Sequence, residues 1–386
     1  MSPPAAAPKH VVIIGGGICG VSTAYFLATH TARLPTTKIT ILEGNKIASA
    51  ASGYSGGFLA KDWHGSATSD LSEMSYNLHE ELSNKFNGQK EWGYRTVDTL
   101  SIETDATRKS KKSSPLPWLE NGLVHSSRSL GSHKTTAQVH PKLFTEFFSK
   151  KFLENPNTEI KFGQVKSLSL NPETNTPKSV SYSTISNDND KQEMIDDIDS
   201  IVICAGPWTG RLSNDLLGSK IGQKLSVQGH RAHSIILKTK QDLTATCLFT
   251  SMTLKDGSAA EPEVYARPDG TTYICGAGDD EPLPETSAEV SPSPNAIAKL
   301  HKQAQALSDI FTTEQNVEIV AEQACYLPIA DRGRPLVGKV RGVENVWIGS
   351  GLSCWGITQG PGTGKVLAEL ILEGKAKSAD ISKLAP

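Results

Sequence analysis

The chain has 386 residues, of which 37% are apolar and 21% are charged, and its formal net charge is -2 at pH 7. This length predicts a large core and two domains. The near-neutral charge offers no field for nucleic acid or anionic lipid, and no apolar run is long enough to span a membrane, so neither partner is expected. The six cysteines form no CxxC pair, which favours a reducing compartment, a cytoplasmic location and no disulfides.

The first predicted elements form a βαβ unit. The stretch "HVVIIGGGICGVSTAYFLATH" contains a short apolar run at Val11–Ile14, a glycine turn, and a helical pattern from Ile18 to about Ala28. A second apolar run, "TKITILEG", ends at Glu43. Short continuous apolar runs are typical of strands that are buried on both faces of a parallel sheet.

The turn between these elements carries the dinucleotide fingerprint Gly15-x-Gly17-x-x-Gly20. Gly15 permits a tight turn, Gly17 lets the backbone approach a pyrophosphate, and Gly20 lets the helix pack closely on the strand. The helix N-terminus offers free N–H groups to phosphates, and the Glu43 carboxylate can accept two ribose hydroxyls. Histidines and cysteines show no ligand spacing and no nucleophile motif occurs, so we predict a dinucleotide site without a metal.

The remaining elements are those of a mixed α/β chain. Small residues dominate 49–59, and 281–294 is interpreted as a loop. The expected elements are a helix within 66–90, an amphipathic helix from His140, a strand pair within 158–170, a hairpin tip in the polar tract 171–199, a buried strand in "DSIVICAGPW", antiparallel strands in 225–280, a helix from the N-cap Asn295 to about Ser308, a buried strand in "ENVWIGSGL", and a closing helix that ends before Gly374.

Four dispersed motifs resemble the D-amino-acid oxidase, glycine oxidase and sarcosine oxidase (DAO) superfamily of FAD-dependent oxidoreductases. They are the fingerprint with Glu43, the small-residue segment from Ser49 to Leu59, the turn in "DSIVICAGPW", and the late segment "GSGLSCWGITQGPGTGKVLAELI". The phrases "SGYSGGFLAKDW" and "QACYLP" look closest to poorly characterised fungal cytosolic members. The resemblance covers nearly the whole chain and implies FAD, which the fingerprint alone does not distinguish from NAD.

The resemblance also implies a fold and a set of FAD contacts. The fold is α/β, with a Rossmann-type (GR2-like) FAD-binding domain and a substrate domain of antiparallel sheet plus helices. The FAD-binding domain is expected at 1–62, 135–225 and 325–386, and the substrate domain at 63–134 and 226–324. The implied FAD-binding residues are Gly15, Gly17, Ile18, Cys19, Gly20, Glu43, Gly44, Ser52, Gly53, Ser55, Gly56, Gly57, Phe58, Leu59, Val165, Ala205, Gly206, Trp208, Cys325, Trp355, Gly356, Ile357 and Thr358.

Two features near the C-terminus bear on how the flavin is held. Cys325 stands where sarcosine oxidases of the family carry a cysteine that is bonded covalently to the flavin. The alternative is a small buried residue, and we favour non-covalent FAD. The stretch "QGPGTGKV" lacks the first glycine and the final Ser or Thr of a nucleotide-triphosphate loop. We predict instead a helix N-terminus near Gly362 whose dipole faces the pyrimidine edge of the flavin.

The chain departs from the family at positions that hold a substrate carboxylate or activate oxygen. Thr358 stands where sarcosine oxidases carry a lysine, and "SGYSGGF" lacks their arginines. Tyr273 stands where those enzymes place the lysine that activates oxygen. A simple amino-acid substrate and a fast reaction with oxygen therefore do not follow from the resemblance.

Four residues are predicted to act at the substrate. Tyr265 and Arg267 lie two apart and so share one strand face, where the guanidinium can bind an anionic group. Trp355 can form a wall beside the flavin ring, and His233 can act as an acid or base. Each has a structural alternative, as a core or surface residue. Further candidates for this pocket are Trp63, His64, His230 and Tyr326.

Together these features predict a FAD-dependent oxidoreductase that acts on a small amine or amino-acid-like molecule. The expected reaction is oxidation of a C–N bond by hydride transfer to flavin N5, with oxygen as the acceptor. Three alternatives remain at this point. They are a dehydrogenase with another acceptor, a FAD-binding interaction or trafficking factor with little catalysis, and an NAD-only dehydrogenase.

Overall fold

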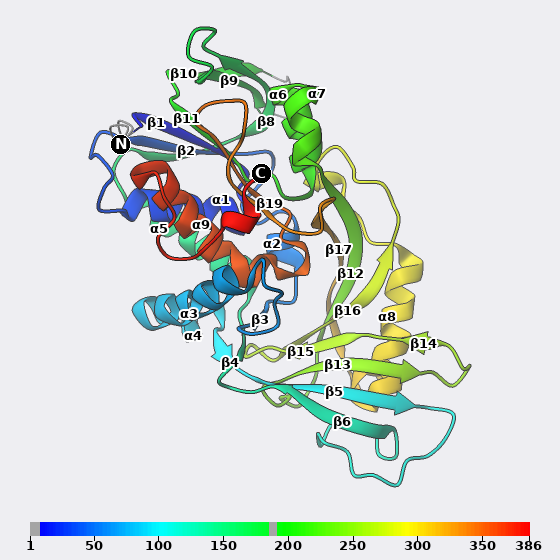
Figure 1. The fold of residues 1–386 in the computed structure, drawn as a ribbon. Helices are drawn as coiled ribbons and strands as arrows, with labels where there is room; N and C mark the ends of the chain where they lie inside the picture. Colours follow the sequence, from blue (N-terminus) through cyan, green and yellow to red (C-terminus); the bar gives the residue numbers. More distant parts are fainter. Residues whose placement is uncertain (1–7, 185–190) are drawn as a thin grey trace.

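Two lobes, each built on a large sheet, make up the protein in a computed structural model that describes residues 8–184 and 191–386 (Figure 1). The first sheet has the strand order β10-β9-β8-β2-β1-β11-β19-β18, and the second has the order β17-β12-β16-β15-β13-β5-β6, with β14 paired to β13. A third, small sheet has the order β3-β7-β4. The strands are β1 (His10–Ile14), β2 (Lys38–Glu43), β3 (Phe58–Ala60), β4 (Arg95–Thr96), β5 (Asp98–Asp105), β6 (Val124–Gly131), β7 (Thr136–Gln138), β8 (Thr158–Leu170), β9 (Pro177–Thr184), β10 (Gln192–Asp196), β11 (Ser200–Ile203), β12 (Val227–Lys238), β13 (Thr246–Thr253), β14 (Ala259–Ala260), β15 (Glu263–Ala266), β16 (Thr271–Asp279), β17 (Glu318–Ala330), β18 (Leu336–Lys339) and β19 (Val346–Ser350).

Helices cover both sheets. The α-helices are α1 (Ile18–Thr29), α2 (Ala51–Tyr54), α3 (Ser69–Phe86), α4 (Gly88–Trp92), α5 (Pro141–Leu153), α6 (Thr209–Leu217), α7 (Ser219–Gly222), α8 (Pro294–Leu307) and α9 (Gly356–Glu373). Within residues 8–184 and 191–386, none of the helices combines the length and the apolar character that crossing a bilayer requires.

The centre of the first sheet is parallel. Strand β1 pairs in parallel with β2 and β11, and β11 pairs in parallel with β19. Every residue of β1 and β11 is buried, which agrees with the apolar runs in the sequence. Helices α1 and α9 pack against each other and against these strands (Figure 1). Since α1 follows β1 and α9 follows β19, the N-termini of both helices lie near the carboxyl ends of the strands.

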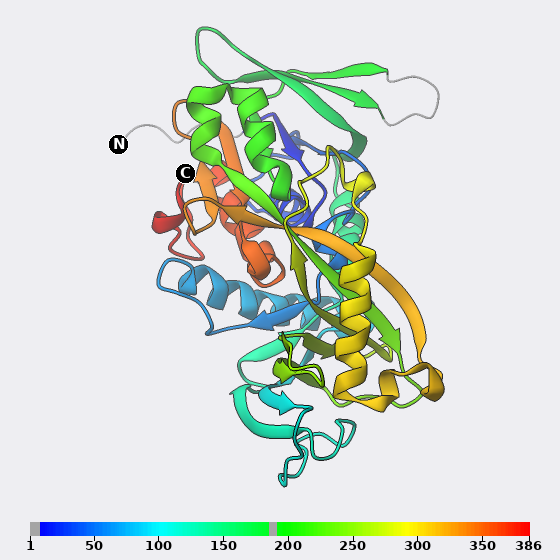
Figure 2. The ribbon, with the colours of Figure 1, turned by 90° about the vertical axis from the view of Figure 1, so that its right-hand side faces the viewer.

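The edge of the first sheet differs from the prediction. Residues 158–170 form the single strand β8 rather than a strand pair, because Gly163 lies in extended backbone and makes no turn. The first half of β8 pairs with β2, and its second half pairs with β9 in a hairpin that extends from the lobe (Figure 2). The polar tract 171–199 contains β9 and β10, and the predicted tip falls partly on residues 185–190, which lie outside the described residues.

Two helix boundaries also differ from the prediction. The helix that ends at Leu307 has Ser293 rather than Asn295 as its N-cap, because the fixed φ of Pro294 suits the first helical position. The helical segment expected within 66–90 is divided into α3 and α4 at Asn87, whose φ of 58° places it in the left-handed region. Asparagine tolerates this conformation better than most residues, so the break has a local cause.

The second sheet presents two different faces. Val264 and Ile274 belong to an apolar core shared with α8, which lies along β12 and β16 (Figure 2). Their neighbours in sequence, Tyr265 and Tyr273, face the opposite side, as strand alternation requires. A Cβ added to Gly56 would lie 2.4 Å from the Tyr265 ring. The face that carries Tyr265 and Tyr273 therefore packs on the segment between α2 and β3 of the first lobe.

Helix α9 does not begin where the sequence predicts. The helix starts at Gly356, so the expected N-terminus near Gly362 is wrong. Pro361 lies inside the helix, although an interior proline removes a backbone donor and usually breaks a helix. In the sequence, a proline between two glycines resembles the start of a helix. Pro361 is tolerated inside α9 because of contacts from α3.

Two side chains of α3 compensate for the interior proline of α9. The Ile357 carbonyl, which would have accepted the missing N–H, accepts a hydrogen bond from His79 Nε2 at 2.8 Å. The Ser75 hydroxyl donates to the Thr358 carbonyl at 2.6 Å and accepts from the Gly362 N–H at 2.8 Å. Buried carbonyls without partners are costly, so these contacts allow the helix to continue.

We expect the stability of the protein to depend on pH through His79. This side chain is fully buried, and burial lowers its pKa from 6.5 to about 4, while the bonds to the Ile357 and Thr358 carbonyls act in the opposite direction. The unfolded chain therefore binds a proton at a higher pH than the folded chain does. Stability is fully present above pH 6.5 and is lost as the pH falls from 6.5 toward 4, by about 2 kcal/mol between about pH 7.5 and about pH 5.

Urea unfolding of the wild type and of His79→Gln at these two pH values measures the effect. Glutamine can still donate to the Ile357 carbonyl, but it does not titrate. The loss of stability at the lower pH should therefore be about 2 kcal/mol smaller in the variant. His140, whose pKa burial also lowers to about 4, is present in both proteins. An unchanged pH dependence would show that His79 is not the titrating group.

Candidate functional site

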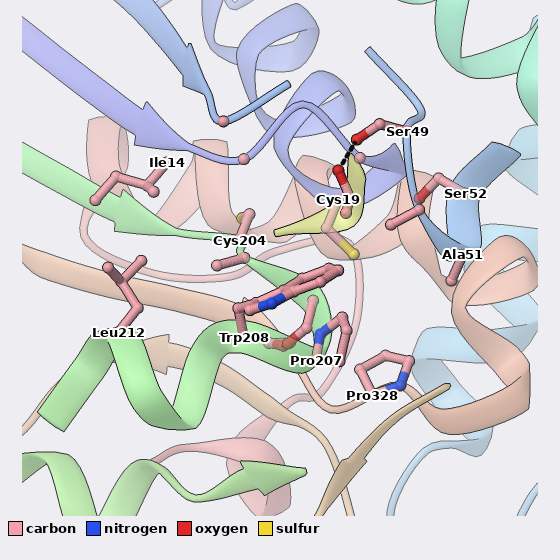
Figure 3. A pocket seen from close by; sticks show the side chains of 18 of the residues that line it. Ile14, Cys19, Ser49, Ala51, Ser52, Cys204, Pro207, Trp208, Leu212 and Pro328 are labelled. Atoms are coloured by element: carbon pink, nitrogen blue, oxygen red, sulfur yellow. Dashed lines mark hydrogen bonds between the residues drawn. The ribbon is translucent and has the colours of Figure 1, made fainter. Parts of the chain in front are cut away.

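One cavity of about 450 Å³ opens where β1, β2, β11 and β19 end, the place where open α/β sheets bind ligands. Figure 3 shows the Cys19 thiol and the Trp208 ring turned into it. The predicted cofactor residues that line it are Gly15, Gly17, Ile18, Cys19, Glu43, Gly44, Ser52, Ser55, Val165, Ala205, Gly206, Trp208, Gly356 and Ile357. The predicted cofactor residues outside its wall are Gly20, Gly53, Gly56, Gly57, Phe58, Leu59, Cys325, Trp355 and Thr358.

The fingerprint glycines hold the first turn against the end of β11. Gly15 has a φ of +110°, and a Cβ added to it would lie 2.3 Å from the Cys204 carbonyl oxygen. A Cβ added to Gly20 would lie 1.9 Å from the Gly15 carbonyl oxygen. Both distances are far below van der Waals contact, so a side chain at either position would push the turn away from the strand. The backbone at Gly17 thereby stays in the cavity wall, at the N-terminus of α1.

Glu43 ends β2 and is held in place by the first turn. Its Oε2 accepts a hydrogen bond from the Gly16 N–H at 2.6 Å, and its Oε1 accepts one from the Asn45 N–H at 2.9 Å. Burial raises the pKa of the carboxyl, while these bonds act to lower it. A carboxylate has about four lone-pair sites. Glu43 therefore retains acceptor capacity toward the cavity that it lines.

Helix α2 covers the start of α1. The Ser52 hydroxyl accepts a hydrogen bond from the Ile18 N–H at 2.9 Å, which satisfies one of the free donors of α1. The Ser55 hydroxyl lines the cavity but is buried without a partner among the described residues. Buried hydroxyls are nearly always hydrogen-bonded. The Ser55 hydroxyl is therefore a polar group that a bound ligand could satisfy.

A segment of the second lobe crosses the cavity, and we call residues 282–287 the strap. The Trp208 indole N–H donates to the Pro284 carbonyl at 2.8 Å. The hydroxyls of Ser49 and Ser287 are hydrogen-bonded at 2.8 Å, and this bond is drawn in Figure 3. The strap thus joins the turn after β11 to the segment that leads into α2. It was predicted only as part of a loop, and it covers the cavity from the side of the second lobe.

The N-terminus of α9 forms the end wall of the cavity. Gly356 and Ile357 line it, and the first N–H groups of a helix have no partner within the helix. Together with the helix dipole they favour negative charge at this place. The helix end that the sequence placed near Gly362 is thus present at the cavity, but it is formed by Gly356.

Aromatic side chains gather beside this end of the cavity, and we call the set Phe58, Trp63, Phe249, Tyr265 and Trp355 the aromatic face. The Phe58 ring stacks on Tyr265 with 5.7 Å between centroids and lies 5.1 Å from the Trp63 ring. Phe249 lies 5.3 Å from Phe58, and Trp355 lies 6.3 Å from Trp63. The predicted substrate residues Tyr265 and Trp355 are therefore connected through the rings of Phe58 and Trp63.

Arg267, the predicted anion-binding residue, follows β15 directly. Its Nη2 donates to the Ser55 carbonyl at 3.2 Å, and its guanidinium lies 5.2 Å from the centre of the Tyr273 ring. Only 6% of the residue is exposed, and burial lowers the pKa of the guanidinium. Within the described residues Arg267 forms no salt bridge, and its Nε has no hydrogen-bond partner. The charge of Asp269 acts on the guanidinium and raises its pKa, but Asp269 forms no salt bridge with it.

Two predicted residues lie apart from this group. His233 Nδ1 is 2.9 Å from the Ala277 carbonyl, and His233 Nε2 accepts from the Ser293 N–H at 3.0 Å, so backbone groups occupy both ring nitrogens. Cys325 is buried on β17, and burial raises the pKa of its thiol to about 12. Cys325 does not line the cavity, and a covalent bond from it to the flavin stays the alternative to the non-covalent FAD that we favour.

The site defines a class of protein. The cavity is lined by four features that matter for binding. They are the Glu43 carboxylate at the end of β2, the glycine turn at the N-terminus of α1, the Ser55 hydroxyl, and the N-terminus of α9 at Gly356. They fit a dinucleotide that carries a flat ring at the α9 end. No group of three metal-ligating side chains was found in the parts of the chain that the structure describes. These features are those of a dinucleotide-binding α/β protein with a second sheet beside the site.

Comparisons with known proteins give the family. The model of the DAO family of FAD-dependent oxidoreductases matches residues 10–370, so this chain belongs to that family. A Schizosaccharomyces pombe protein named as an oxidoreductase is 38% identical, over 98% of this chain and 98% of its own. The structure of L-proline dehydrogenase from P. horikoshii is 18% identical with a TM-score of 0.76, over 98% of this chain and 97% of its own. Glycine oxidase from Bacillus cereus is 18% identical with a TM-score of 0.73, over 98% of each chain.

These findings confirm three predictions from the sequence. The chain is a FAD-dependent oxidoreductase of the DAO family, and its cofactor is FAD. Its fold is the α/β fold of that family, with a Rossmann-type domain and a second sheet-plus-helices domain. The individual cofactor residues, the domain boundaries and the substrate residues remain predictions.

Proposed function

We propose that the protein oxidises a C–N bond of a small amine or amino-acid-like molecule and passes the electrons to oxygen. The observation that carries the proposal is the buried Arg267, whose Nε has no hydrogen-bond partner among the described residues and whose Nη2 contacts the cavity wall at Ser55. The names of two solved relatives in fold, a glycine oxidase and an L-proline dehydrogenase, support an amino-acid-like substrate. Bound FAD supplies the two-electron acceptor, while the protein binds and orients both molecules.

Different residues of the cavity would bind different parts of FAD. Glu43 would accept the ribose hydroxyls, and the turn from Gly15 to Gly17 would receive the pyrophosphate at the N-terminus of α1. The Ser55 hydroxyl and the start of α9 at Gly356 would face the ring end of the cofactor. We assign FAD binding to the first lobe, largely residues 1–62, 135–225 and 325–386, and substrate binding to the second lobe.

The second lobe supplies the groups that bind and orient the substrate. The Arg267 guanidinium offers two or more N–H donors to an anionic group, and burial among Ser55 and Tyr273 fixes its position. The aromatic face excludes water from the reacting carbon, which strengthens the contacts with charged groups. Breaking the C–H bond requires no strong base, because hydride leaves from the neutral amine; a substrate that arrives as an ammonium cation must release one proton first.

A different electron acceptor is the second candidate. Tyr273 occupies the position of the oxygen-activating lysine, and it is buried against Tyr265 with their rings stacked at 5.9 Å. The nearest cation to the Tyr273 ring among the described residues is Arg267, which already contacts Ser55. This substitution favours a dehydrogenase if the guanidinium does not replace the charge of the lysine.

Anaerobic titration of the FAD-loaded protein tests the proposal. A panel of primary, secondary and N-methylated amines and amino acids is added, and absorbance near about 450 nm is followed. We expect at least one amine to bleach this band. Rapid mixing of the reduced protein with oxygen then separates the two candidates, since an oxidase reoxidises faster than free reduced flavin. A panel in which no compound bleaches the band would reject amine oxidation and favour a FAD-binding protein with little catalysis.

A further inference from the structure

We propose that Glu263 binds the ammonium group of the substrate and that the aromatic face forms the walls of this cation site. The inference rests on the proposed function, and it names a substrate class. That class is amines which bind as alkylammonium cations, including N-methylated ones. Sequence reasoning missed Glu263, although it lies two residues before Tyr265 and so shares its strand face.

Glu263 occupies a defined position on the second sheet. It begins β15, where it is paired with Phe249 of β13 on one side and with Cys275 of β16 on the other. The Tyr265 hydroxyl donates a hydrogen bond to the carboxylate, and the Cys275 Sγ lies 3.7 Å from Oε2. Directly paired residues project from the same face of a sheet. The carboxylate therefore projects on the side of the aromatic face, with Phe249 next to it.

The carboxylate lacks a counter-ion. Glu263 is largely buried, and burial raises its pKa, while the bonds from Tyr265 and Cys275 act to lower it. No lysine, arginine or histidine within residues 8–184 and 191–386 forms a salt bridge with it. An ionised carboxylate removed from water is costly unless a cation accompanies it. Two donors leave further lone-pair sites on its oxygens, so an ammonium group can bind.

The surrounding rings suit a cation. Phe58, Trp63, Phe249 and Trp355 are each partly exposed, so part of each side-chain surface remains accessible to a ligand. Phe249 and Trp63 lie 5.3 Å apart at their centroids. Aromatic faces attract ammonium groups through the ring quadrupole, most strongly for tryptophan, and such rings are the usual partners of methylated ammonium groups. A carboxylate with two tryptophans nearby selects a cation over a neutral molecule of the same shape.

Glu263 is also close to the cofactor cavity. Cys354 lines the cavity immediately before Trp355 and Gly356. Burial raises the pKa of the Cys354 thiol, and the charge of Glu263 contributes to the rise. The carboxylate and the α9 end of the cavity are thus within electrostatic reach of each other. A cation bound at Glu263 would lie next to the end of the cavity that we assign to the flavin ring.

Binding of a matched pair of probes to the FAD-loaded full chain tests the inference. Choline carries a quaternary ammonium group, and 3,3-dimethylbutan-1-ol is its neutral isostere. Changes in tryptophan fluorescence and in the flavin spectrum report binding without any turnover. We expect the wild type to bind choline at least about 10-fold more tightly than the isostere, and Glu263→Gln to remove at least about 10-fold of the choline affinity while leaving the isostere unchanged.

Matched variants and a second assay keep the outcomes distinct. Glu103→Gln removes an exposed carboxylate from β5 of the same sheet and should change neither affinity. If Glu263→Gln does not fold, Trp63→Leu provides the same comparison, because it weakens cation–π attraction but keeps an apolar wall. Equal affinity of the wild type for both probes would overturn the inference. The amine panel stays independent of it, since equal bleaching of wild type and Glu263→Gln by amines would support amine oxidation and reject the cation site.

Discussion

Gly15→Ala is expected to give a folded protein that has lost its FAD. Alanine at this position must adopt a φ of +110° and place its Cβ 2.3 Å from the Cys204 carbonyl oxygen. The strained backbone costs about 1–3 kcal/mol and the close contact a similar amount. Since both costs fall on the turn that lines the cavity, the turn should move away from β11. We expect FAD affinity to fall by at least about 100-fold, which corresponds to about 2.8 kcal/mol.

Absorbance of the purified protein and titration of the apoprotein with FAD measure this loss. Gly65→Ala is the matched control, because Gly65 has no heavy atom within 4 Å of an added Cβ and no positive φ is recorded for it. The control should keep its flavin, and circular dichroism should show that both variants fold. A yellow Gly15→Ala protein with unchanged affinity would mean that the cofactor does not use this turn.

The parts of the site that could be predicted are those encoded in a short stretch of chain. The strand, turn and helix around Gly15 and the carboxylate of Glu43 follow from apolar runs, glycine spacing and βαβ topology. These signals are local, because strand burial and the turn depend on neighbouring residues. The predicted strand and turn before Trp208 lie where expected for the same reason.

The parts that could not be predicted depend on contacts between distant segments. The continuity of α9 through Pro361 requires Ser75 and His79, which lie 283 and 278 residues before the carbonyls that they contact. No sequence pattern predicts the position of the strap over the cavity, because that position depends on hydrogen bonds to Trp208 and Ser49. Nothing in the sequence pairs Glu263 with Phe249 until the register of β13 and β15 is known.

The two lobes are joined where cofactor and substrate would meet. The Gln323 side chain of β17 donates to the Tyr54 carbonyl at 2.9 Å, and Arg267 donates to the Ser55 carbonyl at 3.2 Å. Both contacts reach the short segment at the end of α2, which also carries the unpaired Ser55 hydroxyl. A change in either side chain should therefore affect the cavity as well as the second sheet.

Arg267→Met is expected to weaken the binding of anionic ligands while FAD remains bound. Methionine fills a similar length with apolar atoms, so the packing over the Tyr273 ring is largely kept. A hydrogen bond to a charged group contributes about 1.5–3 kcal/mol, so loss of the guanidinium should weaken benzoate, a simple carboxylate probe, by about 10- to 100-fold. Perturbation of the flavin spectrum measures benzoate affinity without a known substrate.

Two controls separate anion binding from a structural role of Arg267. Arg128→Met removes an exposed arginine from β6 of the same lobe and should leave benzoate affinity unchanged. Arg267→Lys keeps the positive charge but loses the planar fork, so it should recover only part of the affinity. If Arg267 serves only to hold the Ser55 carbonyl, Arg267→Met will lower the melting temperature and release FAD while benzoate affinity of the remaining holoprotein stays the same. Because the buried guanidinium forms no salt bridge within residues 8–184 and 191–386, we expect the opposite result, in which melting changes little and benzoate binding is weakened.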